Sequence, residues 1–170
     1  MDSHDQVIAA LAEELGSHLS AHRLTCTTAE SCTGGMIGAA ITSVAGASGW
    51  FHGGVIAYSN EVKMRLLGVP EACLKNNGAV SAETVAAMAD GAANLLRSDC
   101  AIAVSGIAGP GGGSEEKPVG LIYFGIRVNG TTATHRFLFS GDRHSIRRVA
   151  TKQGLSLLIE RLSGNNPQSA

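Results

Sequence analysis

Residues 24–44 read LTCTTAESCTGGMIGAAITSV, and this stretch predicts a strand, a tight turn and a helix in immediate succession. The run 24–29 is rich in β-branched residues, which favour strands. Residues 30–35 supply the polar side chains and the glycines of a turn, and the apolar residues from Met36 onward continue as a helix. A strand that leads directly into a helix is typical of α/β folds.

Two further apolar runs end in polar or glycine residues. Gly54–Tyr58 is followed by a helical segment at 62–67, and Cys100–Val104 opens into a glycine-rich loop at 105–114. The remaining expected elements are an amphipathic helix over 5–22, an Ala-rich helix from a Ser81 cap to Leu96, a hairpin around Asn129-Gly130 between 119–128 and 131–139, and a helix over 143–162.

This order of elements predicts one domain over residues 1–170, with a tail after Leu162 that frays. We expect a three-layer α/β/α sandwich with a mixed, mostly parallel sheet of about five strands and one antiparallel strand.

Composition and charge exclude several classes of protein. Of the 170 residues, 44% are hydrophobic and 16% charged, which excludes global disorder. Thirteen Lys and Arg against fourteen Asp and Glu give a net charge of -1, so no positive field attracts nucleic acid or an anionic membrane. The four cysteines have neither CxxC spacing nor neighbouring histidines, and we therefore expect no metal site. The charged first residues lack a signal peptide's apolar core, and no run is apolar enough to span a membrane, so we expect a cytoplasmic protein.

Ligands of open α/β sheets bind outside the carboxyl ends of the parallel strands. In this sequence those ends carry residues 30–35, 58–63 and 105–110. Ser31 lies on the first of them, at a turn before a helix. It is either a nucleophile close to free helix N–H groups or, like Thr33, a residue that caps the helix.

Lys63 and Tyr58 belong to the second strand end. Lys63 lies one helical turn after the strand, where burial and the helix dipole would lower its pKa enough for a base; a solvated surface charge is the alternative. Tyr58 is either a core aromatic or a hydroxyl directed at a ligand. A Ser-His-Asp triad is poorly supported, because His52 precedes its strand instead of following it.

The loop SGIAGPGGGSEEKPVG, 105–120, has neither the lysine-serine ending of a P-loop nor the Rossmann GxGxxG spacing. It is either a backbone cradle for a phosphate or carboxamide, or a flexible lid. Arg143, Arg147 and Arg148 begin the last helix, where a cation opposes the helix dipole, so they bind a phosphate or form an exposed face.

Five segments together resemble the CinA C-terminal-domain family: TAESCTGG (28–35), WFHGGVIAYSNEVKMRLLGV (50–69), GAVSAETV (78–85), SGIAGPGGGSEEKPVG (105–120) and FSGDR (139–143). They extend over nearly the whole chain. The family contains the nicotinamide mononucleotide amidohydrolases, and in competence/damage-inducible proteins the domain is fused behind a molybdopterin-binding-like domain.

The resemblance implies hydrolysis of the carboxamide of nicotinamide mononucleotide, giving nicotinate mononucleotide and ammonia in pyridine nucleotide recycling. It implies that Ser31 is the nucleophile and that Lys63 and Tyr58 assist it. We expect neutral Lys63 to take the Ser31 proton, and Tyr58 to orient Lys63 or the departing amine, with no metal or cofactor. The expected substrate-binding residues are Thr33, Gly34 and Gly35 around the oxyanion, and Ser105, Gly106, Gly109 and Arg143 around the ribose and phosphate.

Two other classes of function are kept as alternatives. The first is a non-catalytic nucleotide-binding or sensor module, which ammonia release would distinguish from an enzyme. The second is an RNA-binding domain of similar layered architecture, which the net charge of -1 disfavours. The expected partners are a small-molecule nucleotide and a second copy of the chain in a homodimer, with neither nucleic acid nor membrane.

Overall fold

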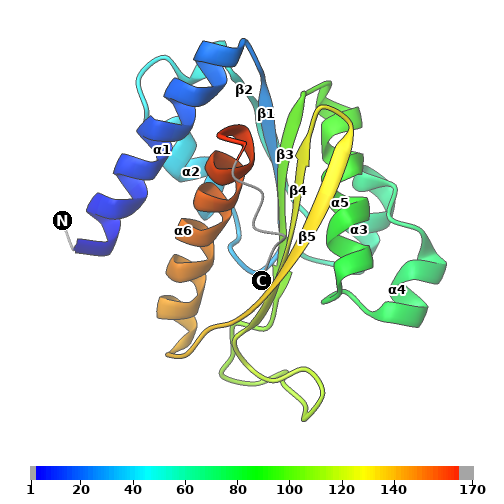
Figure 1. Cartoon of the computed structure of the whole chain (residues 1–170). Coiled ribbons are helices and arrows are strands. Elements are labelled where there is room, and N and C mark those ends of the chain that lie inside the picture. Colours follow the sequence, from blue (N-terminus) through cyan, green and yellow to red (C-terminus); the bar gives the residue numbers. More distant parts are fainter. Residues whose placement is uncertain (1–2, 165–170) are drawn as a thin grey trace.

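Figure 1 shows the computed structural model, which describes residues 3–164. The tail that we expected to fray lies, from residue 165 onward, outside the described residues. In chain order the elements are α1 (Ser3–His22), β1 (Cys26–Glu30), α2 (Met36–Thr42), the 3-10 helix η1 (Ala47–Gly49), β2 (Phe51–Ile56), α3 (Asn60–Leu67), α4 (Glu71–Asn77), α5 (Ala82–Leu96), β3 (Cys100–Gly106), β4 (Leu121–Val128), β5 (Thr131–Leu138) and α6 (Arg143–Leu162).

The strands form one sheet in the order β2-β1-β3-β4-β5. β1 is parallel to both β2 and β3, whereas β4 is antiparallel to both β3 and β5. Four strands therefore share one direction and β4 runs against them. Helices α1, α2 and α6 pack together on one face, and α3, α4 and α5 on the other (Figure 1). The predicted three-layer sandwich with one antiparallel strand is confirmed.

The two faces of the sheet carry cores of different character. Because side chains alternate along a strand, Ile102 faces the core under α1 and α6, while Ala101 and Ala103 face α5. Small side chains let α5 approach the sheet closely. A Cβ at Gly125 in β4 would lie 2.3 Å from the Val85 carbonyl oxygen of α5, so this close approach requires glycine.

The register of the parallel strands brings their carboxyl ends to one edge of the sheet. Glu30 at the end of β1 pairs with Ile56, the last residue of β2, and with Val104 near the end of β3. The turn after β1, the segment before α3 and the loop after β3 consequently begin side by side, as in other open α/β sheets.

The glycine-rich loop returns at this same edge, since β4 is antiparallel to β3. Its two ends are joined by the Ile107 amide, which donates to the Leu121 carbonyl at 2.9 Å, and the Gly120 amide, which donates to the Ile107 carbonyl at 2.7 Å. The loop between these bonds projects from the edge at the bottom of Figure 1.

Several element boundaries agree with the sequence predictions and some do not. The hairpin turn has positive φ at both Asn129 (47°) and Gly130 (84°), as a two-residue hairpin requires. β2 begins earlier than predicted, at Phe51, because Phe51 already pairs with Cys26 of β1. Helix α4 was not predicted, since it has only seven residues and one buried side chain, Leu74.

Candidate active site

Lys63 is buried at the carboxyl edge of the sheet, with 1% of its surface exposed. The Ser59 hydroxyl caps α3 by accepting a hydrogen bond from the Val62 amide. Lys63 follows in the first turn of α3, on the side that packs against the protein. The cap therefore sets the position from which its long side chain reaches the end of β1.

The amine of Lys63 has three polar neighbours. Its Nζ lies 2.8 Å from the Ala57 carbonyl oxygen, 3.2 Å from the Tyr58 carbonyl oxygen and 3.2 Å from Ser31 Oγ. Within residues 3–164 no carboxylate forms an ion pair with it. Burial lowers the pKa of Lys63 below its ordinary value. Nζ donates to all three oxygens. Once the amine is neutral, its two N–H groups can stay on the carbonyls while its lone pair accepts the Ser31 hydroxyl hydrogen.

Ser31 is the first residue after β1, and its amide still donates to the Val104 carbonyl of β3 at 3.0 Å. The sheet thus fixes the backbone of Ser31. The adjacent Cys32 is also buried, and burial raises the pKa of its thiol to about 12. Because only a thiolate is a strong nucleophile, the Cys32 thiol is inert and the Ser31 hydroxyl is the nucleophile candidate.

Glu30 holds the turn after β1 from the inside. Its carboxylate, 1% exposed, accepts hydrogen bonds from the Thr33 hydroxyl at 2.6 Å and from the Gly35 amide at 3.0 Å. It also accepts from the amides of Ile37 and Gly38 at 3.1 and 2.8 Å. Glu30 therefore occupies the N-terminus of α2, where unpaired amides favour a negative charge.

Arg147 of α6 holds the same turn from the other side. Its Nε donates to the Cys32 carbonyl at 3.0 Å and its Nη2 to the Thr33 carbonyl at 2.9 Å. Among the three arginines proposed for a phosphate or a solvated face, Arg147 thus binds backbone, whereas Arg148 forms an ion pair with Asp5 at 2.6 Å.

Tyr58 and Arg143 lie together. The Tyr58 side chain is exposed, and its hydroxyl accepts a hydrogen bond from Arg143 Nη2 at 3.3 Å. Arg143 also donates through Nη1 to the Gly109 carbonyl at 2.8 Å. Lys63 Nζ bonds to the Tyr58 backbone carbonyl, whereas the Tyr58 hydroxyl bonds to Arg143.

Ser105 and the glycine-rich loop form the wall opposite α3. The buried Ser105 hydroxyl donates to the Ala79 carbonyl at 2.7 Å. Lys117 secures the far part of the loop by donating to the carbonyls of Asn77 and Val80 at 2.7 and 2.8 Å. The segment after α4 and the glycine-rich loop are therefore joined at two places.

A cavity of about 190 Å³ lies among these groups. It brings together six residues of the expected site: Ser31, Lys63, Tyr58, Ser105, Gly106 and Arg143. Its other lining residues are Cys32, Ala79, Val80 and Ala108. Of the remaining expected residues, Thr33, Gly34 and Gly35 lie beside the cavity in the Ser31 turn without lining it, and Gly109 contributes only the carbonyl that Arg143 binds.

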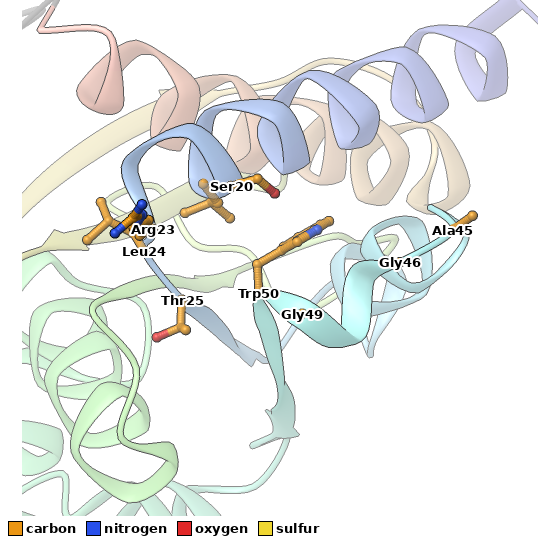
Figure 2. A pocket seen from close by; sticks show the side chains of 9 residues that line it. Ser20, Arg23, Leu24, Thr25, Ala45, Gly46, Gly49 and Trp50 are labelled. Atoms are coloured by element: carbon orange, nitrogen blue, oxygen red, sulfur yellow. The ribbon is translucent and has the colours of Figure 1, made fainter.

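A larger cavity, of about 580 Å³, lies at the opposite edge of the sheet between the end of α1 and η1 (Figure 2). Trp50 and Gly49 line one side of it, and Arg23 and Thr25 line the other. No residue of the expected site is among its lining residues. The larger cavity is therefore not the one that holds the expected site residues.

Residues 3–164 contain no group of three or more His, Cys, Asp or Glu side chains arranged to hold a metal ion. No helix in that part of the chain is both long and apolar enough to cross a membrane.

The sequence analysis assigned no role to Glu30, and it expected Arg147 to bind a phosphate or form an exposed face, whereas both contact the Ser31 turn. Glu30 had a local signal, because a glutamate just before a helix start is placed to accept its free amides. No sequence signal predicted that Arg147 contacts this turn, since it belongs to α6, more than a hundred residues along the chain.

Comparisons with known proteins agree on one family. The CinA C-terminal domain family matches residues 8–162. The nicotinamide-nucleotide amidohydrolase PncC of Escherichia coli (strain K12) is 47% identical over 162 residues, which cover 95% of this chain and 98% of that protein. A putative competence-damage inducible protein of Caldicellulosiruptor bescii is 51% identical over 144 residues, which cover 85% of this chain and 35% of that longer protein.

Solved structures show the same fold. The competence damage-inducible protein A of Klebsiella pneumoniae has a TM-score of 0.89 at 37% identity, covering 92% of this chain and 97% of that one. The competence/damage inducible protein CihA of Agrobacterium tumefaciens has a TM-score of 0.88 at 40% identity, covering 92% of this chain and 96% of that one. From the family match and from these identities over most of its length, the chain belongs to the CinA C-terminal domain family.

Proposed function

We propose that this protein is a nicotinamide-nucleotide amidohydrolase, which converts nicotinamide mononucleotide and water to nicotinate mononucleotide and ammonia. One observation carries the proposal: Nζ of the buried Lys63 lies 3.2 Å from Ser31 Oγ in a cavity. A serine activated by a neutral lysine can attack an amide without histidine. The substrate is suggested by the near full-length similarity to PncC of Escherichia coli.

In the first half of the reaction, neutral Lys63 accepts the Ser31 proton as Oγ forms a bond to the carboxamide carbon. The tetrahedral intermediate then collapses. Its carbon–nitrogen bond breaks, the leaving NH₂ takes the proton back from the Lys63 ammonium, and ammonia departs. An acyl-enzyme on Ser31 and a neutral Lys63 remain.

In the second half, Lys63 accepts a proton from water as the water oxygen attacks the acyl carbon. The bond from that carbon to Ser31 Oγ breaks, and Oγ takes the proton from Lys63. The carboxylic acid product leaves after loss of its proton to solvent. Both residues return to their initial protonation states, so the cycle requires only water.

The oxyanion needs N–H donors close to Ser31. We expected them near Thr33, Gly34 and Gly35, but the Gly34 amide donates to the Ser31 carbonyl and the Gly35 amide to Glu30. Within the described part of the chain, the amides of Cys32 and Thr33 donate no hydrogen bond to another residue. We therefore assign the oxyanion to these two amides.

Recognition of the nucleotide is proposed to involve Arg143 and the glycine-rich loop. A guanidinium has five N–H donors, and Arg143 uses two of its nitrogens on Gly109 and Tyr58. Its side chain lines the cavity and is exposed, so the remaining donors can bind a phosphate. Ser105 and Gly106 at the end of β3 would then lie beside the ribose or the ring.

The test is ammonia release from nicotinamide mononucleotide, compared with a Ser31→Ala variant that keeps the fold. We expect turnover in the parent and none above background in the variant, with substrate still bound by both. A Ser31→Ala protein that releases ammonia at the parent rate would contradict the covalent scheme. Binding without turnover in the parent would instead favour the non-catalytic nucleotide-binding module.

A further inference from the structure

The turn that carries Ser31 lies between two opposite charges that contact its backbone. Glu30 accepts hydrogen bonds from the Thr33 hydroxyl and the Gly35 amide of the turn and from the first amides of α2, and Arg147 donates to two carbonyls of the turn. No ion pair joins Glu30 and Arg147. Each charge is therefore balanced by backbone dipoles of the same short segment.

The hydrogen bonds of Glu30 limit which backbone N–H groups remain available to bind a substrate. A helix N-terminus normally offers several free N–H groups to an anion. Here the Glu30 carboxylate already accepts from Gly35, Ile37 and Gly38. In the described turn, the amides near the nucleophile that donate neither to Glu30 nor to another residue are those of Cys32 and Thr33.

Arg147 fixes the direction of one of these amides. Its Nε binds the Cys32 carbonyl, which belongs to the same peptide group as the Thr33 N–H. Because a trans peptide is planar, its N–H points opposite to its carbonyl, so the Thr33 N–H points away from the guanidinium. The second bond of Arg147, from Nη2 to the Thr33 carbonyl, likewise directs the Gly34 N–H away from the guanidinium. That N–H donates to the Ser31 carbonyl.

We propose that Glu30 and Arg147 are a pair of positioning residues that set the geometry of the nucleophile and of the oxyanion donors. The inference rests on the proposed role of Ser31 as nucleophile. Neither side chain lines the cavity, so both act through the backbone of the turn. Their loss should lower kcat while leaving KM and the pH dependence set by Lys63 nearly unchanged.

Arg147→Ala is the first test. A displacement of a reacting group by about 1 Å can lower a rate by about a hundredfold, and we expect a loss in kcat of that order with KM changed by less than about twofold. Methylguanidinium added to the variant should restore part of kcat, because it can bind the two carbonyls again. Arg148→Ala is the matched control, since this neighbour on α6 pairs with Asp5 and should keep the parent kcat.

Glu30→Gln is the second test. The glutamine side chain keeps the shape of the carboxylate. Its NH₂ group is a donor, however, and cannot accept hydrogen bonds from the N–H and O–H groups that it faces. We expect kcat per folded molecule to fall about tenfold or more, with KM nearly unchanged. Full activity in Glu30→Gln or in Arg147→Ala overturns the proposal that these two residues position the turn. A loss of activity in Arg147→Ala that methylguanidinium does not restore overturns it as well.

A readout without substrate separates this inference from the proposed function. A serine-directed phosphonyl fluoride should label Ser31 in the parent, as mass spectrometry of the peptide would detect, and Ser31→Ala should remain unlabelled. The labelling rate should fall in Arg147→Ala and Glu30→Gln and stay unchanged in Arg148→Ala. If the parent is labelled but releases no ammonia, the proposed substrate is wrong and the positioning role of Glu30 and Arg147 still stands. Equal labelling rates in the parent, Arg147→Ala and Glu30→Gln overturn that positioning role.

Discussion

The guanidinium of Arg143 lies 3.3 Å from the phenolic oxygen of Tyr58, although 85 residues separate them in the chain. Arg143 begins α6 and also binds the Gly109 carbonyl of the glycine-rich loop. Tyr58 follows β2, and its backbone carbonyl accepts a hydrogen bond from Lys63 Nζ. The phenol therefore belongs to the group that would hold the nucleotide, and the Tyr58 backbone belongs to the group that would perform the reaction.

Tyr58→Phe removes the hydroxyl and leaves the carbonyl in place. We expect KM for nicotinamide mononucleotide to rise severalfold, because Arg143 loses a partner, while kcat stays within about threefold of the parent. Steady-state kinetics on both proteins would measure this. A large fall in kcat at unchanged KM would instead give the hydroxyl a role at the reacting atoms, as the sequence analysis had expected.

Arg143→Ala should weaken binding of the phosphate. A hydrogen bond to a charged group contributes about 1.5–3 kcal/mol, so KM for the mononucleotide should rise about tenfold to a hundredfold. Nicotinamide riboside and free nicotinamide lack the phosphate, and the parent should use them poorly. The same substitution should hardly alter the kinetics with riboside. If the parent hydrolyses riboside and mononucleotide equally well, Arg143 does not recognise phosphate.

The pH dependence of kcat/KM should report Lys63. A base must be deprotonated, and burial lowers the pKa of Lys63 from its ordinary value. The rate should therefore rise with pH through one ionisation below about 10.4, the ordinary pKa of lysine. Lys63→Arg keeps a cation that does not deprotonate, so it should be nearly as inactive as Lys63→Ala. Substantial activity in Lys63→Arg would make Lys63 an electrostatic anchor and require another base.

The same shift predicts how stability changes with pH. Because folding lowers the pKa of Lys63, the unfolded chain binds more protons between the lowered value and about 10.4, and stability rises with pH through that window. Lys63→Met lacks this titration. The parent should therefore gain stability relative to Lys63→Met as the pH rises from neutral, by at most about 1.4 kcal/mol per pH unit. Urea unfolding at two pH values would measure the difference, and a constant difference would mean that the pKa is the same in both states.

Much of the fold could be predicted because local patterns agree with the tertiary structure. The bounds of α6, the Ser81 cap of α5 and the positive φ values at Asn129 and Gly130 all follow from residue types in short segments. The start of β2 could not be predicted, because Phe51 becomes a strand residue through its pairing with Cys26 of β1, just before an irregularity in the register that leaves out His52.

The site divides in the same way. Ser31 and Lys63 could be named because both follow strand ends, where ligands of α/β sheets bind. Their separation of 3.2 Å could not be derived, since it depends on the depth to which α3 packs against the sheet. The hydrogen bond from the Gly35 amide to Glu30 was missed, although a glutamate just before a helix start is placed to accept the free amides of that helix.

The reversal of β4 determines how this architecture can vary. The chain leaves β3 and re-enters the sheet at the same edge, and the bonds between Ile107, Gly120 and Leu121 close the ladder before the loop begins. Residues can therefore be gained or lost between Ala108 and Val119 without shifting the register of the strands. Those changes would alter the wall opposite α3 while Ser31 and Lys63 stay in place, so substrate range and catalytic chemistry can diversify independently in proteins built on this sheet.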